Sequence, residues 1–262
     1  MNIERFKKVV VRDFHNTYSL FGLSMLIIML TPVALWMLGL VFGEREMPSY
    51  LRMSMIEFVV FLTAAISSMK IYNSCNLVGK GNYFAMLPAS LGEKFWSMLL
   101  YCFVVCPLVV FAGLYAVDTL LTLLPFGPYR EYLWDIPDWK QMVIASGWGY
   151  TSMQGSLSTA GQILGVTSLF MLANTIFKKN KFIKTVLWLM LIGFIAIVVL
   201  VPIMSHIDWN WEWWMEKMMN LFKDADQRTV VNIMFWTKFI FDLAVSAVLL
   251  LITYRRLKKM QY

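Results

Sequence analysis

Ionisable residues inside long apolar runs are the side chains of this sequence best placed to do chemistry. Glu57 lies within the second long apolar run, and Lys238 and Asp242 lie in the last one at positions i and i+4. A charge in hydrocarbon costs roughly 2.5–3.5 kcal/mol on insertion scales, so such groups tend to face a helix bundle or a water-filled cavity. They predict either a substrate or proton pathway, or structural pairs: Lys238 with Asp242, and Glu57 with a neighbour such as Arg52.

Motifs for catalysis and nucleotide binding are missing from the chain. The sequence has no H-E-x-x-H, G-x-S-x-G or C-x-x-C pattern, and the Gly79–Gly81 segment lacks the G-x-x-x-x-G-K-[ST] frame that binds phosphates. An intramembrane enzyme using Glu57 or Asp242 would need a nucleophile or a metal-ligand set beside them, and the sequence offers neither. We therefore expect no enzymatic activity and no cofactor or metal site in this chain.

The elements that must position these residues are membrane-spanning helices. Hydrophobic residues make up 59% of the chain and charged residues 15%, against roughly 45–50% and about 25% in ordinary soluble domains. The composition predicts an all-α integral membrane protein, with residues 1–262 forming a single six-helix transmembrane domain. Runs long enough to cross roughly 30 Å of hydrocarbon lie at about 18–42, 51–69, 95–117, 155–177, 183–205 and 232–254.

The distribution of basic residues predicts the orientation of these spans. Most of the 23 lysines and arginines lie in the N-terminal segment, in the loops after the second and fourth spans, and in the C-terminal tail. The positive-inside rule then places both termini in the cytoplasm. Because the basic residues sit at the ends of apolar runs and not on one separate domain, we do not expect nucleic acid as a partner.

Two segments predict helices that lie on the bilayer surface. Residues 1–16 have apolar side chains at helical spacing between basic ones, which is typical of an interfacial amphipathic helix, although a basic flank that only orients the first span explains them equally well. The segment 206–231 has one apolar, tryptophan-rich face and one charged face, and predicts an outer-surface amphipathic helix before the last span. The bilayer itself is therefore an expected partner.

Small residues and prolines predict how the spans pack and bend. Gly161-x-x-x-Gly165 gives the fourth span a face on which another helix can approach closely, within or between subunits. Pro32 and Pro107 interrupt the first and third spans, because proline removes a backbone donor and clashes with the preceding turn. We expect kinks at both prolines.

The cytoplasmic loop 70–94 combines a turn with the start of a helix. Leu87-Pro88 disfavours helix just before the proline, and Ser90-Leu91-Gly92-Glu93 has the spacing of a capping box. A helix is therefore predicted to begin at Ser90 and to run directly into the third apolar run. Such a connection suits a surface that passes force between a soluble partner and the membrane.

The same loop carries a family resemblance. The segment Tyr83–Ser90 followed by Glu93-Lys94-Phe95 resembles the LPAS-x-x-EKF segment of ABC-2-type transporter permeases of the Bacteroidota, and the closing Tyr254–Gln261 is similar to their basic tail. The resemblance implies the membrane-spanning subunit of an ATP-driven transporter, with export as the expected direction, in the bacterial cytoplasmic (inner) membrane. It also implies a second permease subunit, identical or different, and a separate ABC ATPase subunit that binds the ATP.

On this resemblance the contact with the ATPase is expected at the loop, through Leu87, Pro88, Ser90, Glu93 and Lys94. Helix capping is the competing role for Ser90 and Glu93, because a capping box stabilises any helix start. A function from another class also fits the sequence: a non-transporting polytopic membrane protein, such as an assembly factor or a sensor, that uses this loop for a different partner.

Overall fold

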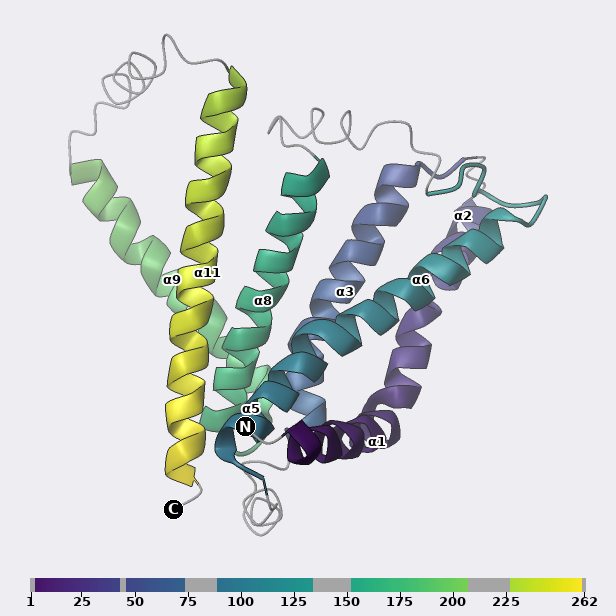
Figure 1. Cartoon of the computed structure of the whole chain (residues 1–262). Helices are drawn as coiled ribbons and strands as arrows, with labels where there is room; N and C mark the ends of the chain where they lie inside the picture. Colours follow the sequence, from purple (N-terminus) through teal and green to yellow (C-terminus); the bar gives the residue numbers. More distant parts are fainter. Residues whose placement is uncertain (1–2, 43–45, 74–88, 134–151, 207–226, 261–262) are drawn as a thin grey trace.

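A computed structural model describes residues 3–42, 46–73, 89–133, 152–206 and 227–260 (Figure 1). Every regular element in this part of the chain is helical. In order, the elements are α1 (Ile3–Met29), α2 (Thr31–Phe42), α3 (Ser49–Ile71), α5 (Leu91–Leu99), the π-helical segment η2 (Leu100–Val105), α6 (Cys106–Thr122), α8 (Ser152–Ile176), α9 (Lys181–His206) and α11 (Gln227–Met260).

Six helical segments within the described ranges are long and apolar enough to cross a membrane: Phe21–Phe42, Leu51–Ile71, Leu91–Thr122, Leu157–Ile176, Lys181–Val199 and Phe235–Lys259. This confirms the predicted all-α class and the six spans, as expected for a multi-pass membrane protein. The amphipathic helix predicted within 206–231 lies outside the described residues, except at the ends of α9 and α11.

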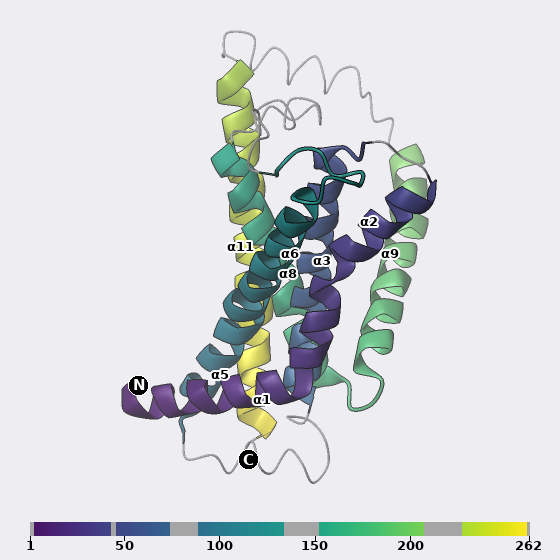
Figure 2. The same ribbon diagram turned by 90° about the vertical axis from the view of Figure 1, so that its right-hand side faces the viewer.

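The segment predicted as a surface helix and the start of the predicted first span lie in one helix, α1. Helix α1 continues to Met29 and the break comes at Leu30, just before Pro32. Pro32 cannot donate to the carbonyl of Ile28, and the Thr31 hydroxyl donates to that oxygen instead at 2.5 Å. Figure 2 shows the N-terminal part of α1 lying across one end of the long helices before the chain rises into α2.

The third span is continuous but changes its winding in the middle. Helix α5 passes into η2 and then into α6 without a break, and the Cys106 N–H bonds to the Tyr101 carbonyl, the i→i−5 pattern of a π turn. Pro107 follows immediately and has no N–H to continue the α-helical ladder. The kink predicted at Pro107 thus takes the form of a π-helical segment just before it.

The spans form two groups that meet where α3 packs against α8, with both chain ends on the same side of the molecule (Figures 1 and 2). Spans one to three share a core that includes Phe21, Ile56, Met98 and Leu114. Helices α8 and α11 pack along each other, and α9 stands largely apart: 6% of its span is buried, against 56% for α3. The first group therefore contains most of the buried structure that can position a site.

Gly161 and Gly165 lie on the face of α8 that meets α11. A Cβ on Gly161 would lie 3.4 Å from the ring of Phe239, and one on Gly165 would lie 3.6 Å from the Ser246 hydroxyl. The two small residues thus let these helices approach closely, the geometry for which a small-x-x-x-small pattern is suited.

Candidate functional site

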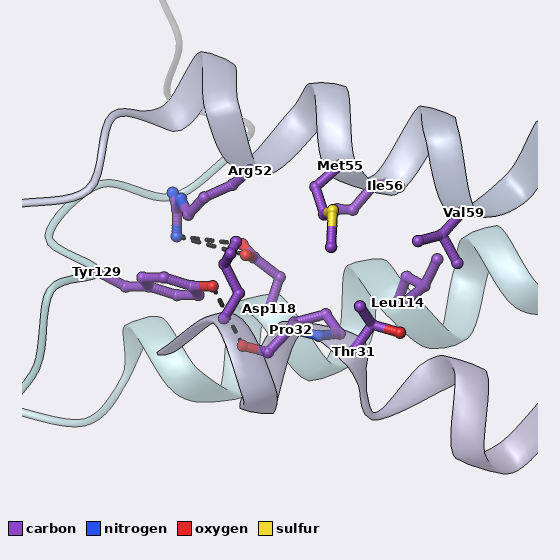
Figure 3. Close-up of a pocket in the computed structure, with 10 residues that line it drawn as sticks. Thr31, Pro32, Arg52, Met55, Ile56, Val59, Leu114, Asp118 and Tyr129 are labelled. Carbon is purple, nitrogen blue, oxygen red and sulfur yellow. Dashed lines mark hydrogen bonds and ion pairs between the residues drawn. The ribbon is translucent and has the colours of Figure 1, made fainter. Parts of the chain in front are cut away.

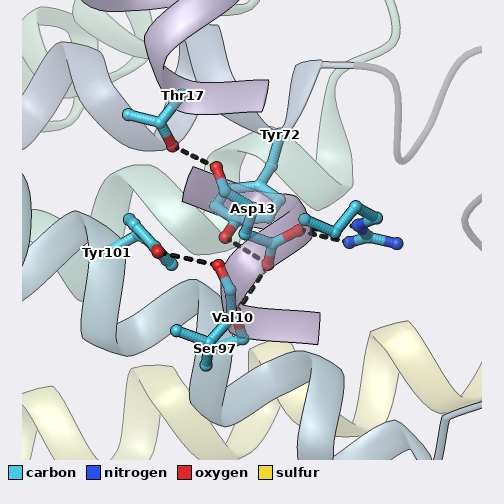
Figure 4. A network of polar contacts seen from close by, with 7 residues as sticks. Val10, Asp13, Thr17, Tyr72, Ser97 and Tyr101 are labelled. Atoms are coloured by element: carbon cyan, nitrogen blue, oxygen red, sulfur yellow. Dashed lines mark hydrogen bonds and ion pairs between the residues drawn. The ribbon is translucent and has the colours of Figure 1, made fainter. Parts of the chain in front are cut away.

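The Asp13 cluster is a buried polar centre at the end of the molecule where both termini lie. The Asp13 residue is 1% exposed, and its Oδ2 accepts hydrogen bonds from the Tyr72 hydroxyl at 2.9 Å and the Ser97 hydroxyl at 2.7 Å (Figure 4). Its Oδ1 accepts from Arg12, with the Nε atom at 3.0 Å. The carboxylate therefore joins α1, the residue after the end of α3, and α5.

Backbone contacts strengthen this junction. The Thr17 hydroxyl donates to the Asp13 carbonyl at 2.7 Å, and the Tyr101 hydroxyl donates to the Val10 carbonyl at 2.7 Å (Figure 4). Span three thus reaches α1 through both Ser97 and Tyr101. A buried carboxylate with three donor groups is well satisfied, so the cluster is suited to anchoring helices rather than to reacting.

Helix α5, which brings Ser97 to the cluster, begins at the predicted capping box. The Glu93 N–H donates to the Ser90 hydroxyl oxygen at 3.3 Å, and the Ser90 N–H donates to Glu93 Oε2 at 2.9 Å. Glu93 and Lys94 are each only 2% exposed. Their side chains therefore hold the start of α5 against the rest of the chain instead of forming an open surface there.

The Arg52 cluster lies at the opposite end of the same three spans. The side chains of Arg52 and Asp118 are 1% and 2% exposed, and Arg52 Nη1 lies 3.3 Å from Asp118 Oδ2 (Figure 3). The same nitrogen lies 3.5 Å from Asp118 Oδ1 and 3.3 Å from the Thr122 hydroxyl. An ion pair buried at this depth links α3 to the end of α6.

The turn after α6 closes over this pair. The guanidinium carbon of Arg52 lies 4.3 Å from the centre of the Tyr129 ring, a cation–π arrangement, and Arg52 Nη2 donates to the Glu131 carbonyl. The Tyr129 hydroxyl donates to the Pro32 carbonyl at 3.2 Å (Figure 3). Arg52 and Tyr129 thus connect α2, α3, α6 and the turn.

Burial keeps the Tyr129 phenol in its donor form. Desolvation is the largest cause that raises the pKa of Tyr129 above its ordinary value; the negative charge of Asp118 raises it further, and Arg52 lowers it. A tyrosine hydroxyl is already protonated at neutral pH, and the raised pKa keeps this one a donor to Pro32 in more alkaline solution as well.

A small cavity lies beside the Arg52–Asp118 pair. Its volume is about 10 Å³. The walls come from α1–α2, α3, α6 and the following turn: Thr31, Pro32, Leu35, Arg52, Met55, Ile56, Val59, Leu114, Asp118 and Tyr129 (Figure 3).

A third polar contact joins α3, α8 and α9. Asn174 Nδ2 donates to the carbonyls of Ser68 at 2.8 Å and Tyr72 at 3.1 Å, which lie at the end of α3. Lys181 Nζ donates to Asn174 Oδ1 at 2.6 Å and to the Asn73 carbonyl at 2.7 Å. Asn174 therefore caps the last carbonyls of α3 and, with Lys181, ties the base of α9 to it.

The ionisable residues singled out from the sequence do not come together in either cluster. Arg52 pairs with Asp118 and not with Glu57, which is exposed on α3. Lys238 is exposed on α11 and Asp242 is partly buried there, and among the described salt bridges none joins the two. Within the expected contact loop, Leu87 and Pro88 lie outside the described residues.

Sequence analysis named Arg52 only as a neighbour of Glu57, and it did not single out Asp13 or Asp118. Asp13 continues the buried face of α1 that also carries Val9 and Thr17, but its charge made it resemble an ordinary flanking residue. Arg52 and Asp118 both lie near the same predicted side of the membrane, so their opposite charges were a signal for a pair. That signal does not say which way each helix is rotated.

Among the described residues, no group of three or more His, Cys, Asp or Glu side chains is placed to hold a metal ion. Comparisons with known protein families, curated proteins and solved structures give no match for the chain. The two buried clusters and the capped helix α5 are therefore the basis for any functional argument.

Proposed function

We propose that the chain is the membrane-spanning subunit of an ATP-driven transporter of the ABC-2 type, an exporter in the bacterial inner membrane with both termini in the cytoplasm. A separate ATPase subunit would bind at loop 70–94 and a second permease subunit would complete the pathway. The observation that carries the proposal is the mechanical connection of α5. It starts within this loop at a capping box, continues into span three, and is joined to α1 through Asp13.

This connection offers a route for force from the loop to the membrane. A push on the Ser90 end of α5 would act on Ser97, which bonds to Asp13 together with Tyr72. Movement of α5 would therefore exert force on α1 and on the end of α3 at the same time. Coupling of this kind requires an element with two arrangements that both sites bias, and the π segment η2 in the middle of span three is our candidate for that element.

The burial of Glu93 and Lys94 refines the proposed contact surface. Both side chains are buried, so we propose that the ATPase meets α5 at Ser90 and Gly92, next to Leu87 and Pro88 of the expected contact, which lie outside the described residues. Ser90 is exposed, and a Cβ added to Gly92 would meet no atom within 4 Å. A side chain at Gly92 therefore starts in open space, and we expect a bulky residue there to block a docking partner.

The test is affinity purification of the tagged protein from its native membrane in mild detergent, followed by identification of the soluble proteins that remain bound. We expect a P-loop ATPase to co-purify with the unmodified protein and to be lost with Gly92→Trp. Gly193→Trp is the matched control, because Gly193 is an exposed glycine on α9 whose Cβ would also meet no atom within 4 Å.

Three outcomes are informative. Loss of the ATPase with Gly92→Trp alone supports both the transporter class and the docking surface. Equal retention in both variants argues against this surface. Recovery of the intact protein without any ATPase, from membranes in which ATPases are expressed, favours a non-transporting membrane protein such as an assembly factor or a sensor.

A further inference from the structure

The N-terminal part of α1 has one face that packs on the rest of the chain and a second, apolar stripe that nothing in the chain covers. The packed face carries Val9, Asp13 and Thr17, which are 7%, 1% and 6% exposed. The uncovered stripe has large apolar side chains at helical spacing, and each is 60% exposed or more: Ile3, Val11, Phe14 and Tyr18. Apolar side chains in such a row on one face of a helix indicate a surface that meets another apolar phase.

Hydrogen bonds fix the level of α1 relative to the spans. Asp13 accepts from Tyr72, which directly follows span two, and from Ser97 near the start of span three (Figure 4). The N-terminal part of α1 runs across this end of the long helices (Figure 2). The helix therefore lies at the level where the apolar part of the bundle ends, and a stripe that points away from the bundle there meets the border of headgroups and acyl chains.

Two lysines accompany the apolar stripe. Lys7 and Lys8 are exposed, and neither takes part in a salt bridge within the described part of the chain. At about 100° per residue, Lys7 lies inside the stripe and Lys8 lies next to Val11 at its edge. Residues 3–18 contain two acids, Glu4 and the buried Asp13. The exposed surface of this part of α1 is therefore both apolar and positively charged.

The end of α11 adds positive charge on the same side of the molecule. The Tyr254 ring lies 5.4 Å from the Phe95 ring of α5, and Leu257 is buried, so this end of α11 is held against the bundle. Between and after these two residues four basic side chains are exposed: Arg255, Arg256, Lys258 and Lys259. Clusters of about four to eight lysines and arginines beside a span attract anionic lipids.

We propose that the exposed side of α1 is a binding surface for anionic phospholipids of the leaflet on the side of both termini. The apolar stripe lies among the acyl chains, and Lys7 and Lys8 reach the headgroup phosphates while their stems stay along the stripe. Anionic headgroups fit better than zwitterionic ones because the positive group of a zwitterion opposes the lysines. The proposal rests on the chain spanning a membrane and not on the transporter function.

The bound lipid would also act on the Asp13 cluster. Since Asp13 joins α1 to Ser97 of α5, lipids that hold α1 at the membrane surface would hold the start of span three there as well.

Site-specific photo-crosslinking tests which side of α1 meets lipid. A benzophenone amino acid is placed at Phe14 or at Asn16 of the full-length chain; both residues are exposed and lie about 200° apart around the helix. After irradiation in the native membrane, mass spectrometry should find phospholipid adducts at position 14 and far fewer at position 16. Equal lipid adducts at the two positions, or adducts with protein in place of lipid at position 14, would overturn the proposal.

The headgroup preference is tested with charge variants of the full-length chain in detergent. Lys7→Gln with Lys8→Gln should weaken the binding of fluorescent phosphatidylglycerol about 25-fold, since one basic residue near an anionic surface contributes about fivefold. Binding of fluorescent phosphatidylcholine should stay unchanged. Lys7→Arg with Lys8→Arg keeps both charges and should bind phosphatidylglycerol as the unmodified chain does.

The matched control is Lys178→Gln with Lys179→Gln. These two lysines are also adjacent and exposed, and they lie between α8 and α9 at the same end of the molecule. We expect this variant to bind phosphatidylglycerol nearly as well as the unmodified chain. An equal loss in both glutamine variants would contradict α1 as the binding surface, and equal affinity of the unmodified chain for the two lipids would contradict the anionic preference.

Discussion

The Asp13 cluster and the Arg52 cluster join the same three spans at opposite ends, yet their charges are stabilised in different ways. Asp13 accepts hydrogen bonds from Tyr72 and Ser97 at 2.9 and 2.7 Å and from Arg12 Nε at 3.0 Å. Asp118 has an arginine of opposite charge at 3.3 Å, and its Oδ2 is without a hydrogen-bond partner in the described part of the chain. Both carboxylates thus have an arginine beside them, but donors reach both oxygens of Asp13, whereas one oxygen of Asp118 has none in the described part of the chain.

The largest expected effect comes from breaking the Arg52 cluster on one side only. Arg52→Met leaves the Asp118 carboxylate buried without its counter-charge, which typically costs about 3–5 kcal/mol of unfolding free energy. Thermal unfolding in detergent, followed by tryptophan fluorescence, should show a large drop in the midpoint.

The matched control is the double variant Arg52→Met with Asp118→Leu, which removes both charges. We expect it to recover most of the lost stability, because apolar side chains often replace a buried ion pair at little cost. A double variant as unstable as the single one would show that the pair itself contributes the stability.

Removing the carboxylate of the Asp13 cluster should lower the free energy of unfolding by less than breaking the Arg52 cluster does. Asp13→Ala deprives the Tyr72 and Ser97 hydroxyls of their acceptor, and we expect a loss of about 2 kcal/mol, since Arg12 remains partly exposed to solvent. His15→Ala, an exposed position on the same helix, should leave the unfolding midpoint unchanged. An Asp13→Ala loss larger than that of Arg52→Met would reverse the comparison.

The turn over the Arg52 cluster predicts that the stability of the chain depends strongly on one glycine, Gly127. Gly127 has φ = +142°, and an added Cβ would lie 2.4 Å from Trp36 Nε1. Gly127→Ala should therefore cost about 1–3 kcal/mol. Gly92→Ala, in open space within α5, should be neutral or stabilising by up to about 1 kcal/mol. Equal midpoints for the two variants would refute the strained turn.

The smallest effect is expected at the cap that supports the Asp13 cluster. Ser90→Ala removes the side chain that accepts from the Glu93 N–H, at a typical cost of about 1 kcal/mol. Hydrogen exchange followed by mass spectrometry should show faster exchange in the first turn of α5 and no change in α6. Faster exchange in both α5 and α6 would mean that the two ends of span three do not respond independently to the loss of the cap.

Local features of the fold were predictable from the sequence. The six spans follow from the length of apolar runs, and the start of α5 follows from the capping-box spacing of Ser90 and Glu93. The irregularities near Pro32 and Pro107 follow from the missing N–H of proline. Each of these rests on neighbours within a few positions, where the backbone geometry is fixed by residue type.

The clusters were not predictable, because they depend on the rotation of whole helices. Asp13 meets Ser97 from 84 positions away, and Arg52 meets Asp118 from 66 positions away. The predicted amphipathic helix at 1–16 likewise gave no sign that Asp13 would be buried against span three. Hydropathy decides that a helix enters the membrane but not which of its faces meets another helix.

The π-helical segment in span three also sets the rotational phase between its two ends. A π turn holds one more residue than an α turn, so deleting Phe103 from η2 would restore regular α winding and leave the rotation of α6 relative to α5 nearly unchanged. Deleting one residue from the regular part of α6 before Asp118 has no such turn to absorb it and would rotate Asp118 by about 100°. Ser97 would stay beside Asp13, while Asp118 would turn away from Arg52. The number of residues in α6 before Asp118 should therefore tolerate a change less readily than the number of residues in η2.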